Sequence, residues 1–169
     1  MGFKEVNIEE LQFNPFTKIG KEWLLITAGN EEKSNMMTAS WGGVGIMWGK
    51  NVASVYIRPQ RYTKEFVDKE ELFTMSFLSE DFRKELSFCG STSGRDVENK
   101  WESASLTPLV TDGTVGVEEA NMIFVCKKLY RQEMLEDCFE SHVEPEKWYP
   151  QKDYHFMYMA EIVKVLVKE

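Results

Sequence analysis

The sequence predicts a mainly β protein, a β-barrel with short helices, rather than a succession of parallel strands and crossover helices. Two observations support this fold class. The clearest apolar runs are short and are separated by Gly, Asn, Pro and other turn residues. Helical patterns are few and short, and residues 73–78 alternate with the two-residue period of a strand that has one apolar face.

The predicted strands are taken in chain order. Trp23–Ala28 ends at a Gly-Asn turn, and Val52–Ile57 lies between a Gly-Lys-Asn turn and Pro59. The next predicted strand, Phe73–Leu78, carries the alternating pattern. Two further apolar runs, Ile123–Leu129 and Phe156–Val167, complete the expected sheet.

Three short helices are expected between these strands. Tyr62–Lys69 follows Pro59 and holds Tyr62 and Phe66 four residues apart, on one helix face. Ser79 is the expected N-cap of a second helix, with Phe82 and Leu86 as its buried pair. Asp96–Trp101 is the third.

Length and composition favour one domain over residues 1–169, with a core that needs no disulfides. The net charge of −8 argues against a nucleic-acid partner. Three cysteines without a CxxC pair fit a reducing cytosol. The first residues lack the apolar core of a signal peptide, and no run reaches the length of a membrane span. We therefore expect a soluble, cytoplasmic protein without a membrane partner.

The glycine-rich stretch Gly42–Gly49 invites comparison with a dinucleotide-binding loop. Trp48 occupies the third glycine position of that motif, and no helix is expected to begin there. The glycines more simply mark strand bends or a close backbone approach to a ligand.

Two segments carry the chemistry of an anion site. Arg58 and Arg61 follow a predicted strand, three residues apart, and lead through Tyr62 and Thr63 into a predicted helix. The loop 91–96 is rich in hydroxyl groups and glycine, with Lys100 one turn further on. Guanidinium groups and a helix start are typical phosphate ligands, so the two segments together predict a bound phosphate.

Three segments in order, 35–42, 57–63 and 87–100, resemble the signature segments of the flavin reductase-like family, and of its flavoredoxin branch in particular. The resemblance extends from about residue 20 to the C-terminus. It implies a split β-barrel that binds FMN at a homodimer interface. One departure is visible: Ala160 stands where the family commonly has Gly before Glu.

The resemblance also implies roles for individual residues. Segment 35–41 would lie beside the isoalloxazine ring, segment 58–63 would hold the ribityl phosphate, and segment 89–100 would close over the flavin. The cofactor-binding residues implied are Asn35, Thr38, Ala39, Ser40, Trp41, Arg58, Arg61, Tyr62, Thr63, Cys89, Gly90, Ser93, Gly94 and Lys100. His155, which precedes the last predicted strand, is the candidate catalytic residue, with a packing role as its alternative.

Other uses of cysteine and histidine stay open from sequence. Cys138 and His142 have a spacing that zinc sites use, but no paired motif accompanies them, so no metal site is predicted. A nucleophile pair of Cys89 and His155 is a further alternative.

Three functions follow from the resemblance. The first is a flavin reductase that takes hydride from NADH or NADPH onto bound FMN and passes electrons to free flavin or another acceptor. The second is an electron carrier between protein partners, with little activity toward NAD(P)H. The third is a flavin-binding protein for sensing or storage. No motif marks a nicotinamide site.

Overall fold

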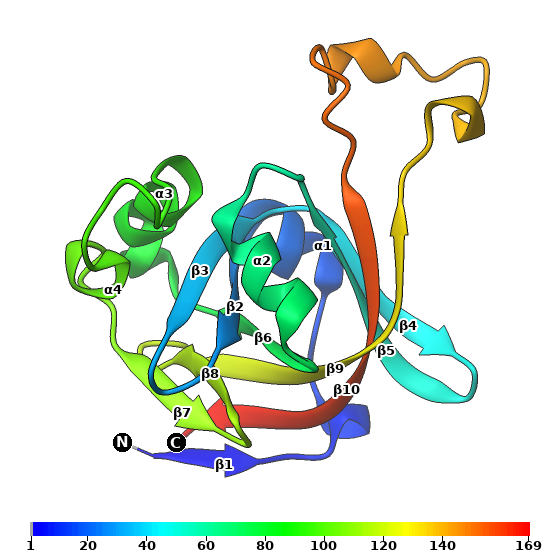
Figure 1. The fold of residues 1–169 in the computed structure, drawn as a ribbon. Coiled ribbons are helices and arrows are strands. Elements are labelled where there is room, and N and C mark those ends of the chain that lie inside the picture. Colours follow the sequence, from blue (N-terminus) through cyan, green and yellow to red (C-terminus); the bar gives the residue numbers. More distant parts are fainter. Residues whose placement is uncertain (1) are drawn as a thin grey trace.

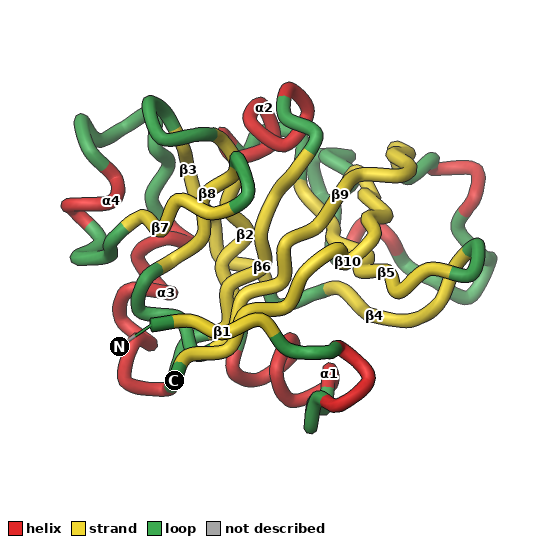
Figure 2. Tube along the Cα trace, turned by 90° about the horizontal axis from the view of Figure 1, so that it is seen from below, coloured by secondary structure: helices red, strands yellow, loops and turns green. Residues whose placement is uncertain are grey.

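A strongly curved antiparallel sheet forms the body of the computed structural model, which describes residues 2–169 (Figure 1). Its strands follow the order β3-β2-β6-β9-β10-β5-β4, and β1 pairs with β10 beside this path. Seen from below in Figure 2, the strands wrap around a common interior, and short helices lie outside them. The predicted mainly β fold with short helices is confirmed.

The strands of this sheet are β1 (Phe3–Glu5), β2 (Leu24–Gly29), β3 (Ser34–Ala39), β4 (Gly42–Met47), β5 (Lys50–Ile57), β6 (Leu72–Phe77), β9 (Met122–Glu133) and β10 (Phe156–Lys168). A separate hairpin consists of β7 (Pro108–Thr111) and β8 (Thr114–Val117). The α-helices are α1 (Pro15–Thr17), α2 (Tyr62–Lys69), α3 (Arg83–Ser91) and α4 (Lys100–Ser103). Five short helical turns complete the chain: η1 (Ile8–Glu10), η2 (Lys18–Glu22), η3 (Glu80–Phe82), η4 (Glu136–Cys138) and η5 (Pro145–Lys147).

Alternation along the strands builds two apolar clusters. In β2, Leu24 and Ile26 belong to the cluster inside the curved sheet, whereas Leu25 belongs to a second cluster on its outer face. Leu86 and Cys89 of α3 pack into this outer cluster. Because β2 is buried on both faces, it reads as a continuous apolar run in the sequence.

Residues 134–155 leave the barrel between β9 and β10 and form a projecting arm with η4 and η5 (Figure 1). The end of the arm returns to the sheet at His155, whose carbonyl accepts a hydrogen bond from the Met134 amide. The arm therefore brings residues 148–155 back to the end of β5.

Most element predictions are confirmed with small shifts. The predicted helix Tyr62–Lys69 is α2, and the five predicted strands correspond to β2, β5, β6, β9 and β10. Trp23 has φ 69°, a left-handed conformation that a strand residue does not adopt, so β2 begins one residue later than predicted.

Two helix predictions need correction. Residues 96–99 form turns, and α4 begins only at Lys100. The side chain of Asn99 caps this helix by accepting a hydrogen bond from the Glu102 amide. Ser79 does precede a helical turn, but its side chain makes no capping bond. Of the predicted pair after it, Leu86 is buried and Phe82 is half-buried.

The glycine-rich segment Gly42–Met47 is strand β4, and a hairpin turn at Trp48 and Gly49, not a helix, leads into β5. At Gly42, with φ 151°, an added Cβ would lie 2.7 Å from the Ser54 carbonyl oxygen. This glycine thus allows close backbone approach within the sheet.

Candidate functional site

Two pockets meet along β3, and Met37 lines both of them. We call them the arginine–lysine pocket, named for Arg61 and Lys100, and the aromatic pocket, named for Trp41 and His155. Their cavity volumes are about 170 Å³ and 230 Å³. Together they form an elongated site between the end of β5, the β3 strand and the loop after α3.

The arginine–lysine pocket brings together residues that are far apart in the sequence. Of the residues implied to bind cofactor, this pocket is lined by Asn35, Arg61, Tyr62, Thr63, Ser93, Gly94 and Lys100. Cys89 and Gly90 take part through their main-chain carbonyls. That these residues lie together agrees with the sequence prediction of a common site. Their roles in binding a cofactor remain predictions.

Both cations of this pocket point at the C-terminal end of α3. Arg61 donates to the carbonyl of Gly90 at 2.6 Å and to that of Cys89 at 3.4 Å. The Lys100 Nζ donates to the carbonyls of Cys89 at 3.1 Å and Met36 at 2.8 Å. These bonds use only part of the donors that a guanidinium and an ammonium group offer.

The charge of these two groups is poorly compensated. Within residues 2–169, Arg61 and Lys100 form no ion pair with a carboxylate. A helix C-terminus supplies only about −0.5 of a charge against two full positive charges. Burial lowers the pKa of Lys100 to about 8, and burial also lowers the pKa of Arg61. Such a pocket favours an anionic ligand.

The remaining walls of the arginine–lysine pocket carry neutral groups and one carboxylate, that of Asp96. Asn35 is buried on β3 and donates to the Thr63 hydroxyl at 2.7 Å, which ties β3 to the first turn of α2. The start of α2 has no side-chain cap. A Cβ at Gly94 would lie 2.2 Å from the Asn35 Oδ1 atom, so only glycine lets the loop come this close.

The aromatic pocket lies at the other end of the site. Of the implied residues, it is lined by Thr38, Ala39, Ser40, Trp41, Arg58 and His155. The Trp41 ring centroid lies 5.2 Å from that of His155 and 5.5 Å from that of Trp148, in the arm. The Trp41 ring plane is inclined by 83° to that of Trp148 and by 53° to that of His155, so the three rings form an angled, partly apolar surface.

The Arg58 guanidinium group is bound by other residues of the same chain. Its guanidinium donates to Asp153 at 2.8 Å and to the Trp148 carbonyl at 2.9 Å. Gln60 donates to the same Asp153 oxygen at 2.7 Å, and hydrogen bonds from Gln60 and Arg58 lower the pKa of that carboxyl group. Arg58 therefore anchors the arm to the end of β5.

His155 is buried beside this anchor and is neutral at pH 7. Burial and the nearby Arg58 charge lower the pKa of His155 to about 4. The Nδ1 atom lies 2.8 Å from the Tyr149 hydroxyl. If that hydroxyl donates, the imidazole keeps its proton on Nε2 and offers it as a donor.

The structure corrects the expected pairing of Arg58 with Arg61. The two guanidinium groups line different pockets, because the Arg61 amide bonds the Arg58 carbonyl in a tight turn that reverses the chain. The nucleophile alternative for Cys89 is also wrong. This thiol is fully buried, its pKa is raised to about 11 by burial, and the His155 imidazole belongs to the other pocket.

Sequence reasoning missed several residues of the site. Met37 and Tyr56 line pockets, whereas Tyr149 and Asp153 support His155 and Arg58. Tyr56 stands in a predicted strand next to Arg58, so alternation could have placed it. No local pattern connects Tyr149 or Asp153 with the site, because the arm that carries them has no regular period.

Among residues 2–169, no three His, Cys, Asp or Glu side chains cluster as metal ligands would. Over the same residues, every helix is too short or too polar to cross a bilayer.

The fold and its two pockets define a class of protein: a curved antiparallel β-barrel with a cationic pocket built from a strand end and a glycine-containing loop. The model of the flavin reductase like domain matches residues 16–169. The chain therefore belongs to the flavin reductase-like family, as its resemblance in sequence predicts.

Solved structures agree on the split-barrel fold. An FMN-binding domain of flavin reductases-like enzyme from Shewanella baltica OS155 matches with a TM-score of 0.71 and 16% identity, over 98% of this chain and 77% of that chain. Flavoredoxin of Desulfovibrio vulgaris (Miyazaki F) gives 0.67 and 23%, over 87% and 69%. The styrene monooxygenase flavin reductase of Pseudomonas putida S12 gives 0.63 and 15%, over 88% and 80%. Comparison with curated protein sequences gave no significant match.

Proposed function

We propose that this protein binds FMN and is an NAD(P)H-dependent flavin reductase. When bound, FMN would supply the redox chemistry, accepting hydride from NADH or NADPH at N5 and passing electrons to free flavin or another acceptor. Membership of the family supports the cofactor, and similar folds include proteins described as FMN-binding and as flavin reductases.

One observation carries the proposal: the half-buried Arg61 and the buried Lys100 are neighbouring cations, and neither forms an ion pair with a carboxylate in residues 2–169. A phosphate dianion would compensate both charges and accept the donors that remain unused. Hydroxyl groups of the loop at Thr92 and Ser93 line the same pocket and add neutral donors.

The aromatic pocket fits the other part of the cofactor. Trp41 and His155 offer ring surfaces, and the main chain lies beside them at Thr38 and Ala39, the end of β3, and at Ser40. The isoalloxazine ring is planar and aromatic, so it suits a pocket with these walls. His155, neutral at pH 7, would act as a hydrogen-bond donor or acceptor toward the ring rather than as a cation.

The first test is uptake of cofactor. Purified protein should be yellow or should take up FMN in a one-to-one ratio, as measured by absorbance. Stopped-flow mixing of the FMN-loaded protein with NADH or with NADPH then follows the flavin band. Bleaching within a turnover time supports the reductase, whereas no bleaching with either nucleotide would contradict it.

A second function is an electron carrier between protein partners. It is favoured by similarity to flavoredoxins from Desulfovibrio vulgaris (Miyazaki F) and Methanosarcina acetivorans. The same stopped-flow experiment separates the two: a carrier would hold FMN but would be reduced by a protein donor and not by NAD(P)H.

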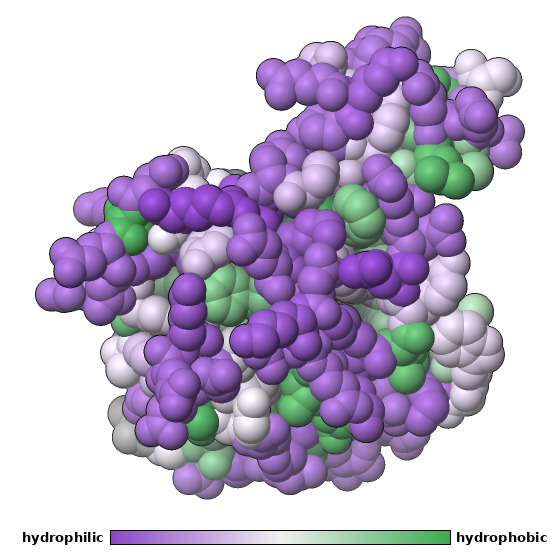
Figure 3. Space-filling model, in the orientation of Figure 1, coloured by the Kyte–Doolittle hydropathy of each residue, from purple (hydrophilic) through white to green (hydrophobic). Residues whose placement is uncertain are grey.

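We also propose a homodimer with FMN near its interface. The hairpin of β4 and β5 exposes Ile46 (71%) and Trp48 (61%), and the arm exposes Trp148 (58%) and Leu135. In Figure 3, hydrophobic surface is visible on the projecting arm among hydrophilic side chains. Large exposed apolar side chains are typical of subunit interfaces. Light scattering of the FMN-loaded protein should give the dimer mass, and a monomer mass would contradict the proposal.

A further inference from the structure

Lys100 is the buried cation of the arginine–lysine pocket, and its charged form has more donors than the protein offers acceptors. The Nζ atom donates to the main-chain carbonyls of Met36 at 2.8 Å and Cys89 at 3.1 Å, and within residues 2–169 no further acceptor binds it. An ammonium group has three N–H bonds, whereas a neutral amine has two. The two carbonyls therefore satisfy the neutral amine completely and leave one N–H bond of the charged form without a partner.

This arrangement favours an amine that can act as a nucleophile. Burial lowers the pKa of Lys100 to about 8, so much of the neutral form is present at mildly alkaline pH. When both N–H bonds of the neutral amine point at carbonyls, the lone pair of the nitrogen points away from them. Lys100 lines the pocket and also a neighbouring groove of about 720 Å³, so a small electrophile can reach the nitrogen.

The other titratable groups of the pocket do not take over this role. The Cys89 thiol keeps its proton, because burial raises its pKa to about 11. Asp96 also lines the pocket, but its side chain is exposed, so water and salt screen its charge. Arg61 keeps its positive charge and attracts an anion toward Lys100.

Arg61 supplies the anion-binding half of this arrangement. Its guanidinium group donates to the carbonyl of Cys89, which also accepts the bond from Lys100. The shared acceptor places the two cationic groups side by side. The start of α2, at Tyr62 and Thr63, lines the same pocket without a side-chain cap and favours the same anion. A phosphate bound at Arg61 would therefore hold any group attached to it next to the Lys100 amine.

We propose that Lys100 of the flavin-free protein is a modification site for acyl phosphates, whose phosphate binds at Arg61 while the Nζ atom attacks the acyl carbon. The nitrogen forms a bond to that carbon, and the bond from the carbon to the phosphate oxygen breaks. Phosphate leaves with the electron pair of this bond and takes up the proton that the nitrogen loses. The product is an uncharged amide, so the pocket loses one of its two cations.

This inference goes beyond the proposed function and rests on it in one respect only: FMN and the acyl phosphate would compete for the same phosphate site. An acylated Lys100 could no longer compensate the charge of a flavin phosphate. Acylation would therefore lower the affinity for FMN, and bound FMN would protect the amine.

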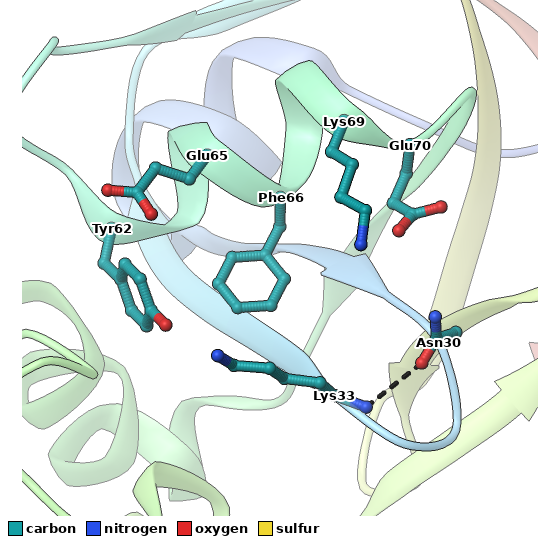
Figure 4. A pocket seen from close by; sticks show the side chains of 7 residues that line it. All are labelled: Asn30, Lys33, Tyr62, Glu65, Phe66, Lys69 and Glu70. Carbon is teal, nitrogen blue, oxygen red and sulfur yellow. Dashed lines mark hydrogen bonds between the residues drawn. The ribbon is translucent and has the colours of Figure 1, made fainter.

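The chain offers a matched control lysine in another pocket. Lys33 lines a pocket of about 160 Å³, close to the 170 Å³ of the arginine–lysine pocket, and Tyr62 lines both. Figure 4 shows Lys33 beside Phe66, and its Nζ atom lies 5.9 Å from the centroid of that ring. Among the described residues that line this pocket are the carboxylates Glu65 and Glu70 but no arginine. Lys33 therefore provides an amine without a neighbouring guanidinium group.

The test treats the flavin-free protein with acetyl phosphate or with a limiting amount of acetic anhydride, a small acyl donor without a phosphate. Peptide mass spectrometry follows acetylation of Lys100 and Lys33. The ratio of the Lys100 rate to the Lys33 rate should be larger with acetyl phosphate than with acetic anhydride by about tenfold or more. Because both ratios compare the same two amines, their quotient cancels differences in basicity and access. Equal ratios for the two donors would overturn the proposal, as would an absence of acetylation at Lys100.

Two further measurements test the position of the phosphate. Inorganic phosphate should slow the reaction of Lys100 with acetyl phosphate and leave that of Lys33 unchanged, a comparison that needs no variant. Arg61→Ala, shown to be folded by thermal unfolding, should slow Lys100 about tenfold with acetyl phosphate but by less than about twofold with acetic anhydride. An equal effect of Arg61→Ala on both donors, or no effect of inorganic phosphate, would overturn the placement at Arg61.

FMN separates this proposal from the proposed function. FMN should slow acetylation of Lys100 but not of Lys33, and the acetylated protein should bind FMN less tightly than the untreated protein. If FMN binds without slowing acetylation of Lys100, the placement of the flavin phosphate is wrong. If the protein does not bind FMN, the proposed function is wrong. In both cases the comparison of the two acyl donors still decides whether Lys100 reacts with acyl phosphates.

Discussion

The two pockets along β3 each contain an arginine, and the two arginines differ in how the protein compensates their charge. Arg58, in the aromatic pocket, is paired with the Asp153 carboxylate and a main-chain carbonyl. Arg61, three residues later, donates to main-chain carbonyl groups and lies near Lys100, and within residues 2–169 neither cation forms an ion pair with a carboxylate. An arginine that is paired with a carboxylate of the same chain has a structural role. An arginine in a pocket whose charge is not compensated by the protein is suited to bind an anionic ligand. We therefore propose that the cofactor phosphate binds at Arg61 and not at Arg58.

The largest expected effect distinguishes these two arginines directly. Arg61→Ala should weaken FMN binding by about 1.5–3 kcal/mol, the contribution of a charged hydrogen bond. Arg58→Ala, the matched control, should weaken it by less, because its partner is Asp153. Flavin fluorescence titration measures both, and thermal unfolding of the flavin-free variants reports damage to the fold. A larger loss in Arg58→Ala than in Arg61→Ala would reverse the assignment.

A glycine substitution sharpens the same comparison at the wall of the arginine–lysine pocket. Gly94→Ala places a Cβ 2.2 Å from the Asn35 amide oxygen and 3.0 Å from the Tyr62 ring. Overpacking of this kind costs about 1–3 kcal/mol in the free energy of unfolding, and the displaced loop should also lose FMN affinity. Gly43→Ala is the control, since a Cβ there meets no atom within 4 Å. Parent-like stability and FMN affinity in Gly94→Ala would contradict the packing described here.

The pH dependence of FMN binding tests the charge of Lys100. Its pKa is about 8 in the flavin-free protein, and a bound phosphate would raise it, so binding takes up a proton above pH 8. FMN affinity should then fall by up to about tenfold per pH unit above 8, until the pKa of the complex is reached. Lys100→Met should remove this part of the dependence. If the parent and Lys100→Met had identical pH profiles of FMN affinity, Lys100 would not be the group that causes this pH dependence.

The same lysine has a predictable effect on stability. Its folded pKa lies below its usual value of 10.5, so between pH 8 and 10.5 the unfolded chain binds more protons. The free energy of unfolding of the flavin-free protein should therefore rise with pH in this window by the contribution of Lys100, and that contribution is lost as pH falls through 8. Denaturant unfolding gives the free energy of unfolding of the parent and of Lys100→Met at each pH, and the difference between the two isolates the contribution of Lys100. A difference that does not vary with pH would contradict the shift.

The smallest expected effect lies in the aromatic pocket. Tyr149→Phe removes the hydroxyl that contacts the His155 Nδ1 atom, which should lower stability by about 0.5–1.5 kcal/mol. FMN affinity should change less than in Arg61→Ala, because Tyr149 acts through His155 and not on the phosphate. NMR of the His155 ring would report the altered hydrogen bond. An unchanged ring signal would show that the contact does not fix the imidazole.

Much of the fold was predictable from local patterns. Pro59 and the spacing of Tyr62 and Phe66 predicted the bounds of α2, because helix starts and apolar periodicity are local properties. The alternation in β6 likewise follows from its two different faces. The short helix after the 91–96 loop was misplaced, because several polar residues could cap it and only the fold selects Asn99.

The candidate site was predictable as a set of segments but not as two pockets. Spacing placed Arg58 and Arg61 together, whereas the turn between them separates their side chains. Tyr149 and Asp153, which contact His155 and Arg58, both come from the arm, and Asp153 is 95 residues away from Arg58 in the sequence. Pairings at such separation are decided by tertiary structure, and a single sequence carries no local signal for them.

The most direct measurement compares FMN with riboflavin, which has the same ring and ribityl chain but no phosphate. In the parent protein, FMN should bind more tightly than riboflavin by about 1.5–3 kcal/mol or more, and Lys100→Met or Arg61→Ala should remove most of that difference while leaving riboflavin affinity nearly unchanged. Equal affinity of the parent for the two flavins, or a difference that persists in both variants, would contradict the placement of the cofactor phosphate in the arginine–lysine pocket.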